Sequence, residues 1–319
     1  KEIEKILNKE ESEKVISYFN ITDEGNFEGK NILNKTEDIP SEDESIIEGA
    51  LSKLYQERSK RIHPNTDKKI ITSWNSLTIK AFAKAGVIFE NQDYLNTAIK
   101  ATKNILKNNT LNGKIQRVSY DGKVSKIHGM LEDYSFFIQA LIELNESTGD
   151  NKWIEHAIGY TDKMINEFWS EEDKMFFDSG ASSTDTLVRA STSQDNITAS
   201  GISVACEVLI KLSRILNDKG YEKIVENQLI SSSTEITKFP AAHCNSAKLL
   251  GENPYNEQLV LAGTDLSEFI TISNSIYNPD LVFGFNNNSE YFINKNKELL
   301  EEKTTAYLCK NYNCNMPVN

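Results

Sequence analysis

The chain has 319 residues, of which 39% are hydrophobic and 26% charged, and its formal net charge is −12. This is the composition of a soluble globular protein with enough apolar residues for a large core. The acidic balance argues against nucleic acid as a partner, because a phosphate-binding surface needs clustered Lys and Arg. No apolar run approaches the ~20 residues of a membrane span, so we expect a cytoplasmic protein without a membrane partner.

The spacing of apolar residues predicts a chain that is mainly helical. In chain order, helices are expected at residues 2–19 (with a polar break), 41–61, 73–89, 93–107, 131–147, 151–169, 196–216, 221–232, 241–250 and 265–275. Short strands are expected within 115–120 and at 186–189, 258–262, 281–285 and 305–308, before a loop from 309 to 319. Ser41 and Glu44 form the pattern of a capping box that opens the second helix. The helix that ends at Phe89 is apolar nearly all round and should be deeply buried.

Three successive helix pairs make up the middle of the chain. Trp74, Leu131 and Asn196 begin the first helix of each pair, and each unit is about 60 residues long. The first helix of a pair is more apolar than the second, which predicts two concentric layers of buried inner helices and half-exposed outer helices. The loops that lead into the inner helices carry polar and aromatic residues, and a closed double layer would bring these loops together at one end.

The most distinctive stretch lies at the start of the second inner helix, where Glu132, Asp133 and Tyr134 stand side by side. Helix N-termini have backbone N–H groups without partners, and the helix dipole favours anions there. The two carboxylates therefore form either the polar rim of a binding cleft or a charged first turn that caps an ordinary helix.

Four acids in the loops are candidate catalytic residues: Asp67, Glu132, Asp133 and Asp195. Glycoside hydrolysis needs two carboxyl groups on opposite sides of a sugar bond, and three different loops supply these acids. Each acid alone also fits a helix cap or a loop position. The spacing cannot assign an acid and a base among them.

Six further residues are candidates for substrate binding: Lys69, Trp74, Asn75, His128, Tyr134 and Arg189. Trp74 and Tyr134 suit sugar stacking, and large aromatic residues at the start of inner helices also suit a core. Arg189 either clamps a carboxylate or phosphate or forms a structural pair with Asp195. We expect one end of the helical layer, as a sugar site or as a polar plug, to gather Asp67, Trp74, Glu132, Asp133, Arg189 and Asp195.

Four cysteines are too few for a disulfide scaffold. Cys309 and Cys314 are the close pair, and their spacing lacks the further ligands of a zinc site, so no metal is expected. A curled loop would bring the two residues within bridging distance, and we expect them to lie close together. The richness in Asn, Lys, Ile and Glu suggests an AT-biased bacterial genome.

The motifs of the loops and of the tail, taken in order, resemble those of a known family. They comprise Gly25-Asn26 with Gly29-Lys30-Asn31-Ile32-Leu33; Pro64, Asp67, Lys69 and Trp74-Asn75; Gly129 and Leu131-Glu132-Asp133-Tyr134; Phe168-Trp169, Arg189, Asp195, Ser200-Gly201 and Ser203; and Tyr307-Leu308-Cys309, Asn311, Cys314 and Pro317. This series is similar to the helical part of the thioredoxin-domain-containing, spermatogenesis-associated protein family. The chain departs from the family pattern at Lys68, Ser76 and Ile202.

The resemblance implies a mainly α fold, an (α/α)6 toroid of the six-hairpin glycosidase type that is incomplete in this chain. Residues 1–240 would form the toroid portion, and residues 241–319 a small β-containing α+β segment packed on it. A thioredoxin-like domain and the first hairpins would precede Lys1. The apolar side chains of residues 2–19 and 41–61 would then lie exposed or be covered by a second copy.

The resemblance also implies a function class. The leading hypothesis is a domain that binds carbohydrate or acts on it, as a glycoside hydrolase or a sugar epimerase, without a cofactor. The alternative is a non-catalytic scaffold that presents or regulates the thioredoxin-like domain of the same protein. The expected partners are accordingly a sugar or other small molecule, that thioredoxin-like domain and a second copy of the chain.

Overall fold

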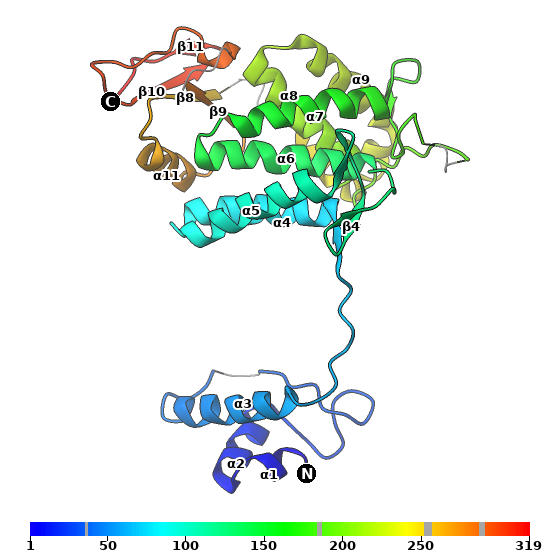
Figure 1. Cartoon of the computed structure of the whole chain (residues 1–319), viewed down its shortest axis with the longest axis vertical. Coiled ribbons are helices and arrows are strands. Elements are labelled where there is room, and N and C mark those ends of the chain that lie inside the picture. Colours follow the sequence, from blue (N-terminus) through cyan, green and yellow to red (C-terminus); the bar gives the residue numbers. More distant parts are fainter. Residues whose placement is uncertain (36–37, 184–186, 252–256, 287–290) are drawn as a thin grey trace. The chain divides into compact units, whose positions relative to one another are not determined.

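The structure of the chain is a computed structural model that describes residues 1–35, 38–183, 187–251, 257–286 and 291–319 (Figure 1). The chain divides into two compact units, Lys1–Asp67 and Lys68–Asn319. The boundary expected at residue 240 lies inside the second unit, and the division of that unit into two domains stays a prediction.

The first unit contains α1 (Ile3–Ile6), α2 (Lys9–Tyr18) and α3 (Glu44–Arg58). Val15 and Ala50 are fully buried and pack with Leu7, because α1 and α2 lie against α3. The expectation that the apolar stripes of residues 2–19 and 41–61 are exposed is therefore wrong for these side chains, since the two segments cover each other. Leu51 and Tyr55 do remain exposed.

The capping box expected at Ser41 does not form. The helix α3 begins three residues later, at Glu44, and Asp43 is its N-cap residue without a side-chain capping bond. The Asp43 carboxylate instead pairs with the ammonium group of Lys14 on α2. A contact between two helices has thus replaced a local cap.

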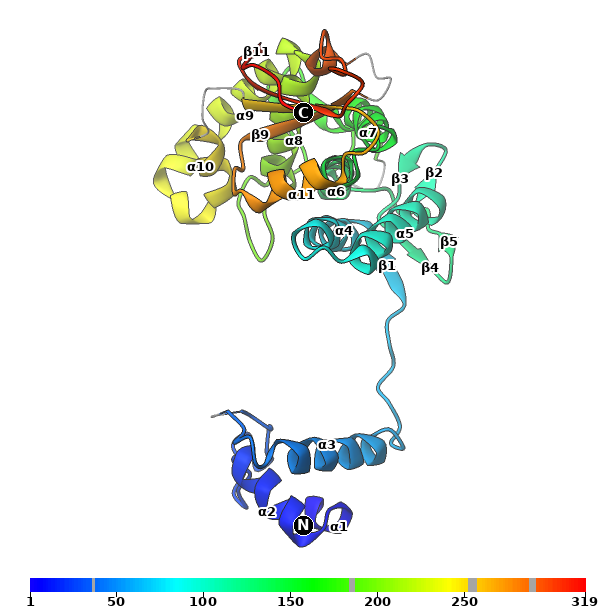
Figure 2. The same ribbon diagram turned by 90° about the vertical axis from the view of Figure 1, so that its left-hand side faces the viewer.

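The second unit contains the three expected helix pairs within its described residues (Figures 1 and 2). They are α4 (Thr72–Ile88) with α5 (Gln92–Asn108), α6 (Leu131–Thr148) with α7 (Lys152–Phe168), and α8 (Gly201–Leu216) with α9 (Lys219–Lys238). The helix α6 packs between α4 and α8 and is buried along almost its whole length. Large buried side chains such as Trp153, Phe137 and Phe168 fill the core around it.

Two inner helices differ from the expectation. The helix α4 is not buried all round, because Trp74, Ala81 and Ile88 are exposed. The helix α8 begins at Gly201 rather than at Asn196, since the preceding residues form a loop that ends in the N-cap residue Ser200. The outer helix α9 continues to Lys238, six residues beyond its expected end.

Short strands connect the helix pairs. The strand β1 (Lys69–Ile71) pairs antiparallel with β4 (Val118–Tyr120), which pairs with β5 (Lys123–Val124). Two further antiparallel pairs are β2 (Thr110–Leu111) with β3 (Lys114–Ile115), and β6 (Trp169–Ser170) with β7 (Met175–Phe176). The pairing of β1 with β4 ties the start of α4 to the loop that precedes α6. Of the strand expected at 186–189, Thr186 lies outside the described residues and residues 187–189 are not a strand.

The C-terminal segment contains η1 (Pro240–Ala242), α10 (Cys244–Leu250), β8 (Glu257–Ala262), α11 (Ser267–Ser275), β9 (Leu281–Asn286), η2 (Phe292–Asn294), β10 (Thr305–Lys310) and β11 (Asn313–Cys314). Its sheet has the order β11-β10-β8-β9, with β8 and β9 parallel and the other pairs antiparallel. Val260, Val282 and Tyr307 belong to the same core as the inner helices. The expected fold class is thereby confirmed, mainly α with helix hairpins and a small β-containing C-terminal segment.

The tail is more ordered than the expected loop, because β10 and β11 form a hairpin. Cys309 and Cys314 are partners across this hairpin and form a disulfide with a Cα–Cα distance of 3.8 Å. The expected proximity of the two residues is confirmed. Among the described helices, none combines the length and the apolar character that crossing a membrane requires.

Candidate functional site

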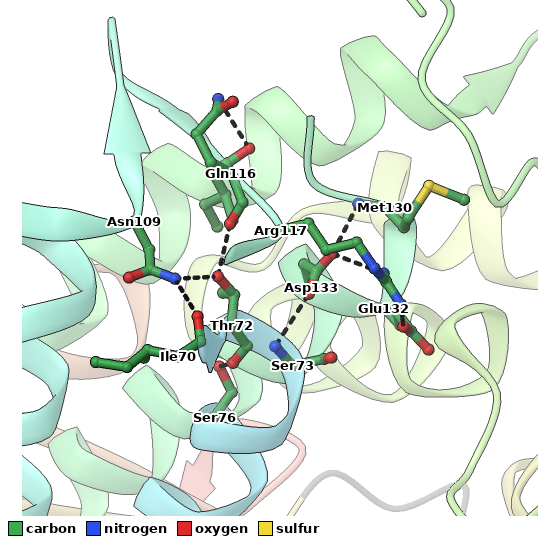
Figure 3. A network of polar contacts seen from close by, with 11 residues as sticks. Ile70, Thr72, Ser73, Ser76, Asn109, Gln116, Arg117, Met130, Glu132 and Asp133 are labelled. Atoms are coloured by element: carbon green, nitrogen blue, oxygen red, sulfur yellow. Dashed lines mark hydrogen bonds and ion pairs between the residues drawn. The ribbon is translucent and has the colours of Figure 1, made fainter. Parts of the chain in front are cut away.

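The carboxylate of Asp133 is the centre of a buried polar network at the start of α6 (Figure 3). Its Oδ1 accepts a hydrogen bond from the backbone N–H of Ser73 at 3.0 Å, and its Oδ2 accepts one from the N–H of Met130 at 2.9 Å. Arg117 Nη1 lies 3.1 Å from the same Oδ2. One carboxylate thus links the N-termini of α4 and α6 to the segment that follows β3.

A second set of hydrogen bonds continues this network along the start of α4. Thr72 Oγ1 donates to the carbonyl of Gln116 at 2.6 Å and accepts from Asn109 Nδ2 at 2.9 Å. Asn109 Nδ2 also donates to the carbonyl of Ile70, and Ser76 Oγ donates to the carbonyl of Thr72 (Figure 3). These bonds tie β1 and the start of α4 to Asn109 and to the segment that carries Arg117.

Burial raises the pKa of Asp133 to about 6, while the N–H of Met130, the charge of Arg117 and the N–H of Ser73 limit the rise. The folded chain therefore holds the Asp133 proton more tightly than the unfolded chain does, and this group favours folding less as the pH rises from about 4 to 7. Since one pKa unit corresponds to 1.36 kcal/mol, this rise in the pKa of Asp133 lowers the free energy of unfolding by about 3 kcal/mol over that pH range.

We expect this change in a comparison of the wild type with Asp133→Asn. The difference between their free energies of unfolding, measured by urea titration, should shrink by about 3 kcal/mol from pH 4 to pH 7. Titrating groups that do not interact with Asp133 cancel in this difference. A difference that is constant with pH would show that Asp133 has an ordinary pKa in the folded chain.

Glu132, next to Asp133, lines a pocket. Its Oε1 lies 2.9 Å from Arg117 Nη2, so the guanidinium bridges the two adjacent carboxylates (Figure 3). Burial disfavours the charged guanidinium, but Asp133 and Glu132 outweigh this effect and raise the pKa of Arg117. Glu132 thereby has a permanent positive charge beside it while its carboxylate remains partly exposed.

The pocket has a volume of about 730 Å³ and lies at the N-terminal ends of α6 and α8. Its lining is rich in carboxylate, amide and hydroxyl groups: Arg117, Ile127, His128, Met130, Glu132, Asp178, Thr192, Gln194, Asp195, Asn196, Thr198, Ala199, Ser200 and Gly201. A Cβ on Gly201 would meet the backbone N of Glu132 at 2.8 Å. Glycine at this position thus allows the first turns of α6 and α8, which line the pocket, to approach each other closely.

Asp178 is a second carboxylate of this pocket and was missed in the sequence. Burial raises its pKa, two hydrogen bonds from Thr192 oppose the rise, and the charge of Glu132 adds to it. Thr192 Oγ1 donates to Asp178 Oδ2 at 2.6 Å, and the backbone carbonyl of Asp178 accepts from the N–H of Leu131 at 2.9 Å. Its only signal in the sequence was its place directly after two phenylalanines in a loop with Gly180.

Asp195 lines the same pocket but holds the ends of two helices. Its Oδ1 accepts from the N–H of Ser200 at 2.9 Å and from Ser203 Oγ at 3.3 Å, at the start of α8. Its Oδ2 accepts from the N–H of Asn245 in α10 at 2.8 Å. Of the six residues expected to meet in one cleft, the pocket lining includes Glu132 and Asp195. Asp133 is buried and shares Arg117 with Glu132.

The remaining candidates lie elsewhere. Arg189 neither lines the pocket nor pairs with Asp195: it donates to the carbonyls of Ser179 at 3.0 Å and Glu167 at 3.2 Å. Asp67 ends the first unit and Lys69 lies in β1. None of the described residues that line the pocket is Trp, Tyr or Phe, so sugar stacking is not available there.

Two further candidates, Tyr134 and Asn75, support the helices, and a third, Trp74, does not. Tyr134 is a core residue whose Oη accepts from the N–H of Ile115 at 3.1 Å. Asn75 Nδ2 donates to the carbonyl of Ile71 at 2.9 Å, within the first turn of α4. Trp74 is 66% exposed, which fits neither the core position nor the pocket lining.

A partly buried charge network along the inner helices was also missed. Lys211 on α8 donates to both carboxylate oxygens of Glu146 on α6, at 2.9 and 3.3 Å, and Lys84 on α4 lies 3.5 Å from Glu143. Burial, and then the charge of Glu146, raises the pKa of Glu143. Burial disfavours the charged Lys211, but Glu146 and Glu143 outweigh it and raise the pKa of Lys211. The available signal was charged residues at helical spacing within apolar inner helices.

No protein-family model matches the chain. Human spermatogenesis-associated protein 20 is 25% identical to it over 296 residues, which cover 86% of this chain and 38% of that protein, and the rat protein gives the same values. An uncharacterized protein of Caenorhabditis elegans is 26% identical over 343 residues, which cover 95% of this chain and 46% of that protein. The chain thus spans less than half the length of these curated relatives.

Two solved structures are similar over part of the chain. Cellobiose 2-epimerase from Bacillus thermoamylovorans has a TM-score of 0.43 and 16% identity, covering 52% of this chain and 44% of that one. An α-mannanase from Bacteroides thetaiotaomicron has a TM-score of 0.43 and 16% identity, covering 60% and 56%.

The curated relatives named above are animal proteins, which does not support the bacterial source expected from the composition. The resemblance expected from the loop and tail motifs is confirmed, since the chain is similar to spermatogenesis-associated protein 20 over most of its own length.

Proposed function

We propose that the chain binds a small carbohydrate in the pocket at the N-termini of α6 and α8, and that Glu132 and Asp178 act on it as a pair of carboxyl groups. The lining supports a neutral polyhydroxyl ligand, because carboxylate, amide and hydroxyl groups each accept or donate hydrogen bonds to sugar hydroxyls. Three acids and a single arginine among the lining residues disfavour a phosphate or another anionic ligand.

This proposal rests on the different surroundings of Glu132 and Asp178, two carboxyl groups in one pocket. Burial and the neighbouring Glu132 favour the protonated form of Asp178, whereas the guanidinium of Arg117 lies against Glu132. Two titratable groups with opposed surroundings are the arrangement that general acid–base catalysis uses. Asp178 would donate its proton to the departing glycosidic oxygen, and Glu132 would accept a proton from the attacking water.

Binding is tested by titration calorimetry of the whole chain against neutral hexoses and their α-1,4-linked and β-1,4-linked dimers. We expect Glu132→Gln to weaken binding by about 10- to 100-fold, because it removes a charged hydrogen-bond acceptor worth ~1.5–3 kcal/mol. Asp178→Asn replaces a protonated carboxyl group and should weaken binding by about two- to tenfold, the effect of one neutral hydrogen bond of ~0.5–1.5 kcal/mol. Glu226→Gln is the matched control, since Glu226 is an exposed acid on α9 that pairs with Lys223. Wild-type chain that binds no sugar of the panel would contradict the proposal.

The non-catalytic scaffold remains a second candidate because of one observation. Asp133 and Asp195, two of the four acids expected to be catalytic, are bound to backbone N–H groups at helix starts. The scaffold hypothesis predicts that Glu132→Gln leaves the interaction with a thioredoxin-like domain of the full-length protein intact. A pull-down with that domain, alongside the sugar titration, separates the two functions.

A further inference from the structure

A smaller pocket adjoins the larger one. Its volume is about 150 Å³, roughly the size of a cavity that admits one six-membered ring such as benzene. Ile127, His128 and Met130 line both pockets and thus form a partition between the pockets. Two consecutive residues also line different pockets, because Asp178 lines the larger one and Ser179 the smaller one.

The smaller pocket has aromatic residues in its wall and a polar rim. Tyr134 and Phe168 are buried and meet edge to face, with their ring centroids 5.2 Å apart. At the rim, the ammonium group of Lys114 pairs with Glu167, and Ser182 Oγ donates to the other Glu167 oxygen at 2.6 Å. Aromatic rings with a few polar groups beside them suit a sugar ring, which has apolar faces and hydroxyl edges. The larger pocket lacks such aromatic residues in its described lining.

Ser179 contributes an unused hydrogen-bonding group. The residue is 3% exposed, and its Oγ has no hydrogen-bond partner among the described residues. Its position is fixed, because its backbone carbonyl accepts from Arg189 Nε and Arg189 is held in turn over the ring of Phe177. A buried hydroxyl without a partner is unfavourable, and a ligand hydroxyl that entered the pocket would satisfy it.

We propose that the smaller pocket is a subsite for one terminal sugar ring. The preferred ligand is then a disaccharide or the end of a longer chain that occupies both pockets and crosses the partition at His128. This inference rests on the proposed function of the larger pocket. The volume accommodates a single ring, so longer chains bind by an end and not along their length.

The test uses the whole chain and compares neutral hexoses with their α-1,4-linked and β-1,4-linked dimers by titration calorimetry. Wild-type chain should bind at least one dimer about tenfold or more tightly than the corresponding hexose. Ser179→Ala should weaken binding of this dimer by about five- to tenfold, the effect of one hydrogen bond, and leave hexose binding unchanged. Its melting temperature should not fall, because the removed hydroxyl makes no hydrogen bond to any residue that the structure describes.

Ser233→Ala, at an exposed position of α9, is the control and should change neither affinity. If hexoses bind but the dimers bind no more tightly, or if Ser179→Ala binds them as the wild type does, the subsite is refuted while the proposed function stands. If neither hexose nor dimer binds the wild-type chain, the proposed function and the subsite are both refuted.

Discussion

Replacing Lys211 by methionine should lower the free energy of unfolding by about 3–5 kcal/mol at pH 7, the usual effect of removing one partner of a buried ion pair. Glu146 is 6% and Glu143 9% exposed in their side chains, and Lys211 lies against both oxygens of Glu146. The substitution leaves two buried carboxylates near each other on α6 with less positive charge beside them. Methionine keeps most of the apolar volume, so the loss reports charge and not packing.

Two comparisons separate this explanation from a general packing defect. The double variant Lys211→Met with Glu146→Leu should recover most of the loss, because a buried ion pair replaced by apolar side chains is often neutral in stability. The single variant should also lose less stability at pH 5 than at pH 8. Burial already raises the pKa of Glu143 in the folded state, and loss of the positive charge of Lys211 raises it further, so folding is favoured as the pH falls through that pKa.

Urea unfolding of the three proteins at both pH values makes these measurements. Glu226→Ala, which removes one partner of an exposed pair on α9, should change stability by less than about 1 kcal/mol. Equal losses in the single and double variants would show that the pair contributes no specific electrostatic stabilisation.

Replacing Asp133 by alanine should lower the free energy of unfolding by about 3 kcal/mol. The buried N–H group of Ser73 and the partly buried N–H group of Met130 lose their acceptor, and each unsatisfied buried group costs ~1–3 kcal/mol. Arg117 loses one of its two carboxylates and with it the geometry that holds Glu132. The variant should therefore also weaken sugar binding, although Asp133 itself does not line the pocket.

Thermal or urea unfolding together with calorimetry tests both effects on one protein. Glu132→Gln is the informative comparison, because it should lose binding while changing stability by less than about 1 kcal/mol at its partly exposed position. If Asp133→Ala has the stability of the wild type, the hydrogen bonds to Ser73 and Met130 do not hold α4 and α6 together. If Glu132→Gln is the less stable of the two, the roles of the adjacent acids are reversed.

The sequence by itself determined the helix pairs and the proximity of the two cysteines that form the disulfide. Helical periodicity is a local property, so the apolar residues of α4 to α9 located these helices to within a few residues except at the start of α8 and the end of α9. The proximity of Cys309 and Cys314 was also predictable, because a separation of five residues limits their distance in any turn. The loop and tail motifs correctly indicated the resemblance to spermatogenesis-associated protein 20.

Only the tertiary structure decided that Asp133 is buried and that Glu132 lines the pocket. Adjacent helical residues point about 100° apart, and whichever direction meets α4 is buried while the other faces the pocket. Arg117 and Asp178 became site residues through contacts with Glu132 and Leu131, which come from distant parts of the chain. Asp195 became a cap because α10 places the N–H of Asn245 beside it, 50 residues further along the chain. Such contacts depend on how helices pack against each other, and periodicity within one segment contains no information about them.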